Sequence, residues 1–131
     1  MKGNLDLGKR GEDVALEYLL ARGMEFVCRN ARAGHKEIDL IFLDGNFIRV
    51  VEVKCRIYPY MTSPLSNVGA RKQSNLIKAM QKLLSKGWIV QDGKKFDLKN
   101  KEVIFDVITI VFNGDFYKLN YIKNKYLTYL Y

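Results

Sequence analysis

Residues 37–54 read EIDLIFLDGNFIRVVEVK, and this stretch decides the fold. Two apolar runs rich in valine and isoleucine flank the pair Asp44-Gly45, which accepts positive φ and favours a tight turn. The pattern therefore predicts a β-hairpin, with one strand over residues 37–43 and the other over residues 46–56.

Three charged side chains, Asp39, Glu52 and Lys54, interrupt these apolar runs. A buried charge is costly unless it is paired, hydrogen-bonded or bound to a metal ion. Alternate residues of a strand face the same side, so Glu52 and Lys54 share a face. These three residues are therefore the leading candidates for a functional site.

The register of the hairpin decides where Asp39 points. If Asp44 and Gly45 form a two-residue loop, Asp39 pairs with Val50. Asp39 and Glu52 are then diagonal neighbours on one face, with their Cβ atoms ~7 Å apart. A three-residue loop would send the two acids to opposite faces, and we expect the two-residue loop.

Two converging carboxylates beside a lysine suit metal-assisted hydrolysis of a phosphodiester. The hard oxygen ligands of Asp39 and Glu52 suit Mg²⁺ or Mn²⁺, which lower the pKa of bound water and offset charge in the transition state. Lys54 would orient the water or stabilise the developing charge. The alternative is a simple strand ion pair between Glu52 and Lys54 with Asp39 near an edge, and spacing alone leaves both open.

The rest of the chain predicts an α/β domain with a mixed sheet and the element order α-β-β-β-α-β-β. Gly23 and Gly87 end the helices, and Pro59 and Pro64 favour a loop. The remaining expected elements are a helix over residues 11–22, a short strand over 26–29, a loop over 57–69, a helix over 70–86, a polar loop over 91–101, and strands over 103–112 and 116–122.

Length and composition fit one globular domain over residues 1–131. The chain has 131 residues, of which 48% are hydrophobic, and 22 Lys and Arg against 14 Asp and Glu give a net charge of +8. This charge favours polyanionic partners, nucleic acid before an anionic membrane, or it serves only solubility. No apolar run approaches the ~20 residues of a membrane helix, and no signal peptide is evident, so we expect a cytoplasmic protein.

The sequence also excludes several classes of site. Cys28 and Cys55 are far apart, which argues against a structural zinc site or a disulfide scaffold and favours buried thiols. His35 is the sole histidine, so a Ser-His-Asp triad with any other histidine is excluded. The phosphate loop of ATPases is absent.

Several separated motifs between Leu7 and Tyr126 resemble the YraN-like family of bacterial proteins, with residues 127–131 as a tail. That family resembles the PD-(D/E)XK superfamily, which includes restriction endonucleases and Holliday-junction resolvases. The motifs are Gly8-x-x-Gly11-Glu12, Arg29-Asn30-x-Arg32, Glu37-Ile38-Asp39-Leu40-Ile41, Val51-Glu52-Val53-Lys54-x-Arg56, Arg71-Lys72-Gln73 and Phe105-Asp106-Val107.

The resemblance implies a restriction-endonuclease-like core with a central mixed sheet flanked by helices. It implies that Asp39 and Glu52 bind the metal and that Lys54 is the catalytic lysine. Glu12 would match a first-helix glutamate found near such sites. Glu12 also shares a helix face with Ala15, which favours an inward carboxylate, although an acid in the first helical turn is equally explained by the helix dipole.

Basic residues are the candidates for contacts with nucleic acid. The resemblance implies that Lys72 and Gln73, beside Arg71, lie near the substrate phosphate; Lys9 and Arg10 are further candidates, and a solvated surface is the alternative for all of them. Two positions depart from the family pattern, Lys36 where glycine is usual and Ile104 where arginine is frequent.

Five tyrosines lie in the last fifteen residues. They would either stack on bases or, as the sequence favours, pack a short tail or form a dimer contact. They are Tyr117, Tyr121, Tyr126, Tyr129 and Tyr131.

Together these features predict an endonuclease that needs Mg²⁺ or Mn²⁺ and acts on nucleic acid, with DNA as the expected substrate and branched DNA among the candidates. The alternative is a protein that keeps the nuclease fold and binds nucleic acid without cleaving it. A scaffold with neither property is a third reading. A homodimer is expected only by analogy with resolvases.

Overall fold

The computed structural model describes residues 4–33, 36–60, 78, 80–82 and 85–123. The predicted Arg71, Lys72 and Gln73 lie outside these residues, as do Tyr126, Tyr129 and Tyr131. The elements are α1 (Asn4–Ala21), β1 (Glu25–Ala33), β2 (Lys36–Asp44), β3 (Phe47–Ile57), β4 (Trp88–Gln91), β5 (Lys94–Asp97), β6 (Glu102–Asn113) and β7 (Phe116–Ile122).

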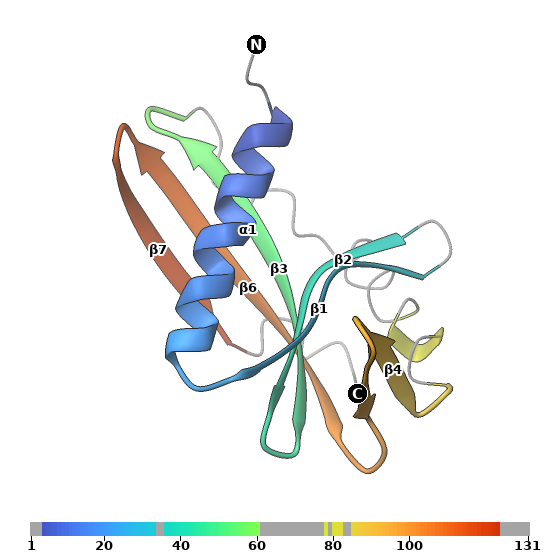
Figure 1. The fold of residues 1–131 in the computed structure, drawn as a ribbon. Coiled ribbons are helices and arrows are strands. Elements are labelled where there is room, and N and C mark those ends of the chain that lie inside the picture. The colour runs from blue at the N-terminus through green and yellow to red at the C-terminus, as the bar shows by residue number, and fades with distance from the viewer. Residues whose placement is uncertain (1–3, 34–35, 61–77, 79, 83–84, 124–131) are drawn as a thin grey trace.

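A five-stranded mixed sheet forms the centre of the molecule, with the strand order β1-β2-β3-β6-β7 (Figure 1). β3 and β6 are parallel, whereas the other neighbouring strands are antiparallel. The crossover between the parallel strands carries a helical segment at residues 78 and 80–82. This confirms the predicted α/β class and agrees with a restriction-endonuclease-like core.

The two faces of the sheet bury separate apolar clusters. On one face, α1 packs through Ala15 and Leu19 against Leu40, Val51 and Ile108. On the opposite face, Met80, Phe96 and Leu98 pack against the sheet. The described cluster there consists of Val27, Cys28, Ile38, Ile41, Ile48, Val50, Met80, Phe96, Leu98, Phe105 and Val107. Within the described part of the chain, no helix has both the length and the apolar character needed to cross a bilayer.

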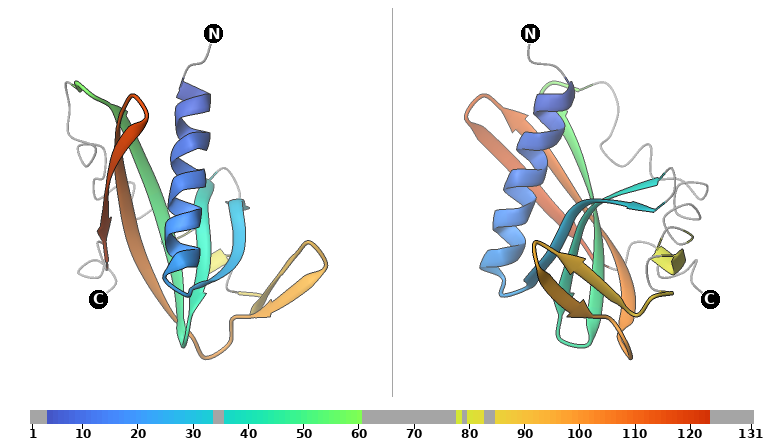
Figure 2. Two further views of the ribbon diagram at one scale, coloured as in Figure 1. Left: turned by 60° about the vertical axis from the view of Figure 1, so that its left-hand side comes forward. Right: turned by 45° about the vertical axis from the view of Figure 1, so that its right-hand side comes forward.

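The predicted polar loop over residues 91–101 is wrong in part, because β4 and β5 form a second, two-stranded sheet. The turn between them uses Asp92 and Gly93, both at positive φ. Phe96 inserts into the core, which explains why a sequence rich in lysine forms a strand here. The hairpin lies beside β1 (Figure 2), and Lys94 of β5 forms an ion pair of 2.8 Å with Glu25 of β1. The predicted order of elements, α-β-β-β-α-β-β, therefore omits β4 and β5.

The predicted register of the β2–β3 hairpin is also wrong, by two residues. Asp44 is not in the loop but pairs with Phe47, and the two loop residues are Gly45 and Asn46. The Arg49 guanidinium holds the Asp44 carboxylate at 2.8 Å, which keeps Asp44 in the strand. Gly45 takes a φ of +60°, as the first central residue of a type II′ turn does. Because the shift is an even number, the face assigned to each side chain is retained.

Gly11 lets α1 approach β3 closely. A Cβ at this position would overlap the sulfur of Cys55 and lie 3.6 Å from a methyl group of Val53. At Gly8, one turn earlier, a Cβ would meet nothing within 4 Å. The glycine at position 11 of the family motif is therefore explained by packing of the helix on the strand that carries Glu52 and Lys54.

A buried charged network joins β3, β6 and β7 beneath α1. Asp106 is fully buried, receives two hydrogen bonds from the Arg49 guanidinium (3.0 and 3.2 Å), and accepts a third from the Tyr121 hydroxyl (2.6 Å). Burial, followed by the hydrogen bond to Asp106, raises the pKa of Tyr121. This phenol therefore remains a hydrogen-bond donor throughout the physiological range.

Removing one partner of a buried ion pair leaves the other charge desolvated. We therefore expect Asp106→Ala to lower the free energy of unfolding by about 3–5 kcal/mol in urea titrations followed by circular dichroism. Asp115→Ala, in the exposed turn between β6 and β7, is the matched control and should change it by less than about 0.5 kcal/mol. Equal losses in the two variants would contradict the network.

Candidate carboxylate site

The candidate site forms where β2 separates from β3. The last paired residues of the two strands are Leu40 and Val51, beyond which β1 and β2 bend away together (Figure 1). A cavity of about 190 Å³ opens at this point, and we call it the carboxylate cavity. Its lining residues are Glu37, Ile38, Asp39, Val50, Val51, Glu52, Val53 and Lys54.

Strand alternation directs the three predicted residues to the same face. Val51 and Val53 pack in the cluster under α1, so Glu52 and Lys54 project to the opposite face of β3. On β2, Leu40 belongs to the α1 cluster, which sends Asp39 to that same opposite face. Asp39, Glu52 and Lys54 therefore meet in one cavity, as the sequence analysis expected, although the specific pairing differs.

Asp39 spans the opening between the strands. Its Oδ2 atom accepts a hydrogen bond of 2.8 Å from the backbone N–H of Val53. This bond continues the connection between β2 and β3 just beyond their last paired residues, and it fixes the Asp39 carboxylate beside the strand that carries Glu52 and Lys54. The aspartate is thus both an anchor for the strand and a wall of the cavity.

Glu52 and Lys54 form an ion pair, with Lys54 Nζ 3.2 Å from Glu52 Oε1. Both side chains are mostly buried, at 7% exposure for Glu52 and 16% for Lys54. Their mutual attraction offsets part of the cost of removing each charge from water. The arrangement also keeps an ammonium group within reach of anything that the carboxylate binds.

Glu12 approaches this region from α1 through one intermediate residue, Asn30. In the amide orientation that satisfies both the side-chain oxygen and the side-chain nitrogen, the nitrogen of Asn30 donates to Glu12 Oε1 (3.2 Å) and to Glu37 Oε1 (3.3 Å). Asn30 lies between the residues that pair with Ile38 and Leu40, and its φ of 54° shows where β1 departs from regular strand geometry. Glu12 therefore contacts the wall of the carboxylate cavity indirectly.

Arg29 holds the acids of α1 against β1. Its guanidinium contacts Glu12 at 3.1 Å and Asp13 at 2.6 Å, and it also donates to the backbone oxygen of Lys9. The hydrogen bond from Arg29 lowers the pKa of Asp13 below its usual range. Arg29 and Asn30 belong to the motif Arg29-Asn30-x-Arg32, but no role for either residue was predicted from the sequence.

The described residues contain no group of three or more His, Cys, Asp or Glu side chains arranged to hold a metal ion. Three acids line the carboxylate cavity, Glu37, Asp39 and Glu52. Glu37 is 42% exposed and forms an ion pair of 3.5 Å with Arg32, so we take Asp39 and Glu52 as the candidate donor pair. Two carboxylates match the small protein ligand set of Mg²⁺, which usually keeps several water molecules and binds substrate phosphate as well. The chemistry of the donors thus fits Mg²⁺ or Mn²⁺.

The predicted basic residues of α1 diverge from the cavity and from one another. Lys9 is highly exposed and lies 3.6 Å from Asp13. Arg10 stacks on the Phe112 ring at 3.9 Å and donates to the backbone oxygen of Gly114 (3.1 Å), next to the turn between β6 and β7. Neither belongs to the described lining of the carboxylate cavity.

Cys55 lies on β3, the strand that carries Glu52 and Lys54, and its side chain packs against Gly11 of α1. Its pKa therefore responds to the charge of this region. Burial, followed by the negative charges of Asp39 and Glu12, raises the pKa of its thiol to about 11. At pH 8 the thiolate fraction of Cys55 is then roughly a hundredfold below that of an unperturbed thiol. Only the thiolate reacts with an alkylating reagent. We expect iodoacetamide to modify Cys55 correspondingly slowly in the folded protein, as followed by mass spectrometry of the peptide.

Asp39→Asn removes one of the charges that raise this pKa and should accelerate the modification of Cys55. Glu102→Gln, an exposed acid at the start of β6, is the control and should leave the rate unchanged. If Asp39→Asn and the wild type reacted at the same rate, Asp39 would not lie where its charge acts on Cys55.

Comparison with known proteins assigns the chain to a family. Residues 11–110 match the model of the uncharacterised protein family UPF0102. A UPF0102 protein of Chlorobium chlorochromatii is 44% identical over 80% of this chain and 74% of its own length. Those of Rhodococcus jostii and Thermodesulfovibrio yellowstonii are 38% and 37% identical, over 85% and 81% of this chain and 86% of their own lengths. The match confirms the resemblance at the level of the YraN-like family: the chain belongs to UPF0102.

Proposed function

We propose that this protein is an endonuclease that depends on a divalent metal and hydrolyses phosphodiester bonds of nucleic acid. The observation that carries the proposal is the convergence of Asp39, Glu52 and Lys54 on one cavity, at the point where β2 and β3 separate. A net charge of +8 favours a polyanionic substrate. Similarity to the PD-(D/E)XK pattern, in which an aspartate is followed by Glu-x-Lys, supports the same reaction class.

Asp39 and Glu52 would hold Mg²⁺ or Mn²⁺ between them. When bound, such an ion supplies a Lewis acid that makes water more acidic and offsets negative charge on the phosphate. The hydrogen bond from Val53 N–H fixes the Asp39 carboxylate in place, so this ligand needs no reorganisation to bind. The hydrolysis adds water across the P–O bond and yields a phosphate monoester and an alcohol.

Lys54 has two uses in this reaction. In the free protein its ammonium neutralises Glu52, at 3.2 Å. With substrate bound, the same ammonium would orient the attacking water or stabilise the negative charge that develops on the phosphate oxygens. Glu12 acts indirectly, since Asn30 connects it to Glu37 of the cavity wall and Arg29 holds its carboxylate. We therefore assign Glu12 a positioning role.

A second candidate is a nucleic-acid-binding protein that keeps this fold without cleaving its ligand. The Glu52–Lys54 ion pair favours this second candidate, because Lys54 already neutralises the carboxylate that would otherwise bind a metal ion. The two candidates share the basic charge and the fold and differ in metal binding and in cleavage.

Cleavage of labelled single-stranded, duplex and branched DNA and of RNA, with Mg²⁺ or Mn²⁺, tests the first candidate. We expect Asp39→Asn, Glu52→Gln and Lys54→Met each to reduce the cleavage rate roughly 10²–10³-fold. The asparagine retains an oxygen that accepts the Val53 hydrogen bond, so loss of activity is separated from loss of fold. Glu102→Gln should cleave like the wild type. Cleavage that persists in Asp39→Asn would reveal another site or a contaminant.

Calorimetric titration of Mn²⁺ tests the ligand set without relying on activity. The wild type should bind the ion, and Glu52→Gln should weaken binding by ten-fold or more, since even the loss of an outer-shell partner costs about that much. Equal heats for the two proteins would overturn the assignment of Glu52 as a ligand. A wild type that binds nucleic acid but neither Mn²⁺ nor Mg²⁺ would support the second candidate.

A further inference from the structure

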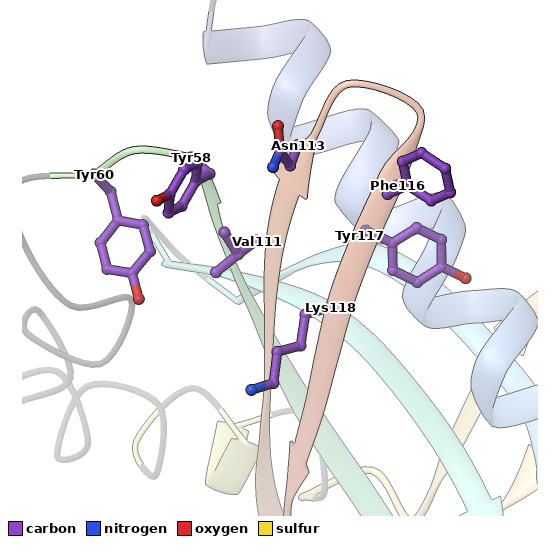
Figure 3. Close-up of a pocket in the computed structure, with 7 residues that line it drawn as sticks. All are labelled: Tyr58, Tyr60, Val111, Asn113, Phe116, Tyr117 and Lys118. Atoms are coloured by element: carbon purple, nitrogen blue, oxygen red, sulfur yellow. The ribbon is translucent and has the colours of Figure 1, made fainter.

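A second cavity lies beyond the end of β3, and its walls are largely aromatic. It has a volume of about 360 Å³, and we call it the aromatic pocket. Figure 3 shows Tyr58 and Tyr60 after β3, beside the β6–β7 hairpin that carries the other lining residues. The lining residues within the described part of the chain are Tyr58, Tyr60, Val111, Asn113, Phe116, Tyr117 and Lys118.

The aromatic rings of this pocket face solvent to an unusual degree. Tyr58, Tyr60, Phe116 and Tyr117 are between 44% and 81% exposed, with Phe116 the most exposed. A cluster of exposed apolar side chains usually marks a binding surface. Tyr117 pairs with Phe112, a member of the cluster under α1, so its ring lies on the α1 face and packs edge-on against Phe112 at 5.9 Å, whereas Phe116 shares the face of Lys118.

The charge of the pocket matches an anionic ligand. Lys118 is its charged lining residue, and no acid belongs to its described lining. Arg10, fixed over the Phe112 ring and bonded to Gly114, brings a second cation to the adjacent turn. Asp115, in that turn, is the nearest acid along the chain.

β3 leads from the carboxylate cavity to the aromatic pocket. Residues 50–54 line the first, residues 53–57 line a groove of about 560 Å³ beside Leu7 and Gly8, and Tyr58 lines the pocket. Lys54 and Tyr58 are four residues apart, or about 13 Å along an extended chain, which is the length of about four stacked nucleotides.

Strand register extends this path across the sheet. Arg56 is aligned with Val111 of β6, which is paired with Lys118 of β7. Aligned residues of neighbouring strands share a face, so Arg56 and Lys118 lie on the face that also carries Glu52 and Lys54. The positively charged side chains of Lys54, Arg56 and Lys118 therefore lie on one face, between the carboxylate cavity and the aromatic rings.

We propose that the aromatic pocket binds unpaired nucleotides of the substrate strand, by stacking bases on Tyr58 and Phe116 while Arg56 and Lys118 contact the phosphates. The inference rests on the proposed function and narrows its substrate class to nucleic acid with a single-stranded segment next to the cleaved bond. Stacking on aromatic side chains requires bases with free faces, which a continuous duplex does not offer.

Fluorescence anisotropy with a labelled twelve-nucleotide thymidine oligomer tests the proposal, in EDTA so that no cleavage occurs. We expect Tyr58→Ala and Phe116→Ala each to weaken binding about tenfold, in line with the energy of one stacked base. Tyr58→Phe keeps the ring and should bind like the wild type. Trp88→Ala, which removes an exposed ring on the β4–β5 hairpin, is the matched control and should have no effect.

A labelled duplex of equal length shows whether the rings select unpaired bases. Its affinity should be unchanged in Phe116→Ala if the proposal holds. Single-strand binding that is equally tight in wild type and both alanine variants would overturn the proposal. Loss of self-association in Phe116→Ala, measured by sedimentation with binding unchanged, would instead assign the surface to a second copy of the chain and overturn it as well.

The nuclease proposal and the aromatic-pocket proposal can each be contradicted without the other. Cleavage that depends on Asp39, combined with ring variants that bind normally, would contradict the aromatic pocket and leave the nuclease intact. Binding that depends on the rings, in a protein that neither binds Mn²⁺ nor cleaves, would contradict the nuclease and support stacking of unpaired bases.

Discussion

The separation of β2 from β3 beyond Leu40 and Val51 is the constraint on which the site depends. Had the two strands stayed paired, their backbones would have satisfied each other and left no cavity. Here the hydrogen bond from Val53 N–H to the Asp39 carboxylate connects the two strands just beyond their last paired residues. A backbone donor in a partly buried position thus gains an acceptor, and an acid is fixed beside Glu52 and Lys54. Fold and site share this one contact.

The charges around this opening are arranged in compensating groups. Arg29 neutralises Glu12 and Asp13 on the α1 side, and Lys54 neutralises Glu52 within the cavity. Beneath α1, Arg49 performs the same task for the fully buried Asp106. Because a buried charge without a partner would be costly, these pairs allow several acids to exist in a small basic protein. Glu37, Asp39 and Glu52 line one cavity, and the exposed Glu37 is paired with Arg32, so Asp39 and Glu52 are the candidate ligands.

The sequence predicted most of the sheet because its strands are long, apolar and separated by turn residues. It predicted the shared face of Asp39, Glu52 and Lys54, since that depends only on whether the loop is even or odd. It did not predict the exact register, because the ion pair between Asp44 and Arg49 decides which residues enter the turn. The β4–β5 hairpin was missed because its strands are short and lysine-rich, and its stability comes from the burial of Phe96, a tertiary effect. Asp106 and Arg49 carried the same signal as Asp39, a charge within an apolar run, yet only the fold brings them together.

The central claim is that Asp39 and Glu52 bind one divalent ion, and Mn²⁺-induced line broadening in the ¹⁵N-labelled protein measures it most directly. Paramagnetic broadening falls steeply with distance, so the ion reports its own position. We expect sub-stoichiometric Mn²⁺ to broaden the backbone amides of Asp39, Val53 and Lys54 first, and Asp39→Asn to abolish this effect. Broadening that begins elsewhere, with these three amides unaffected, would contradict the claim.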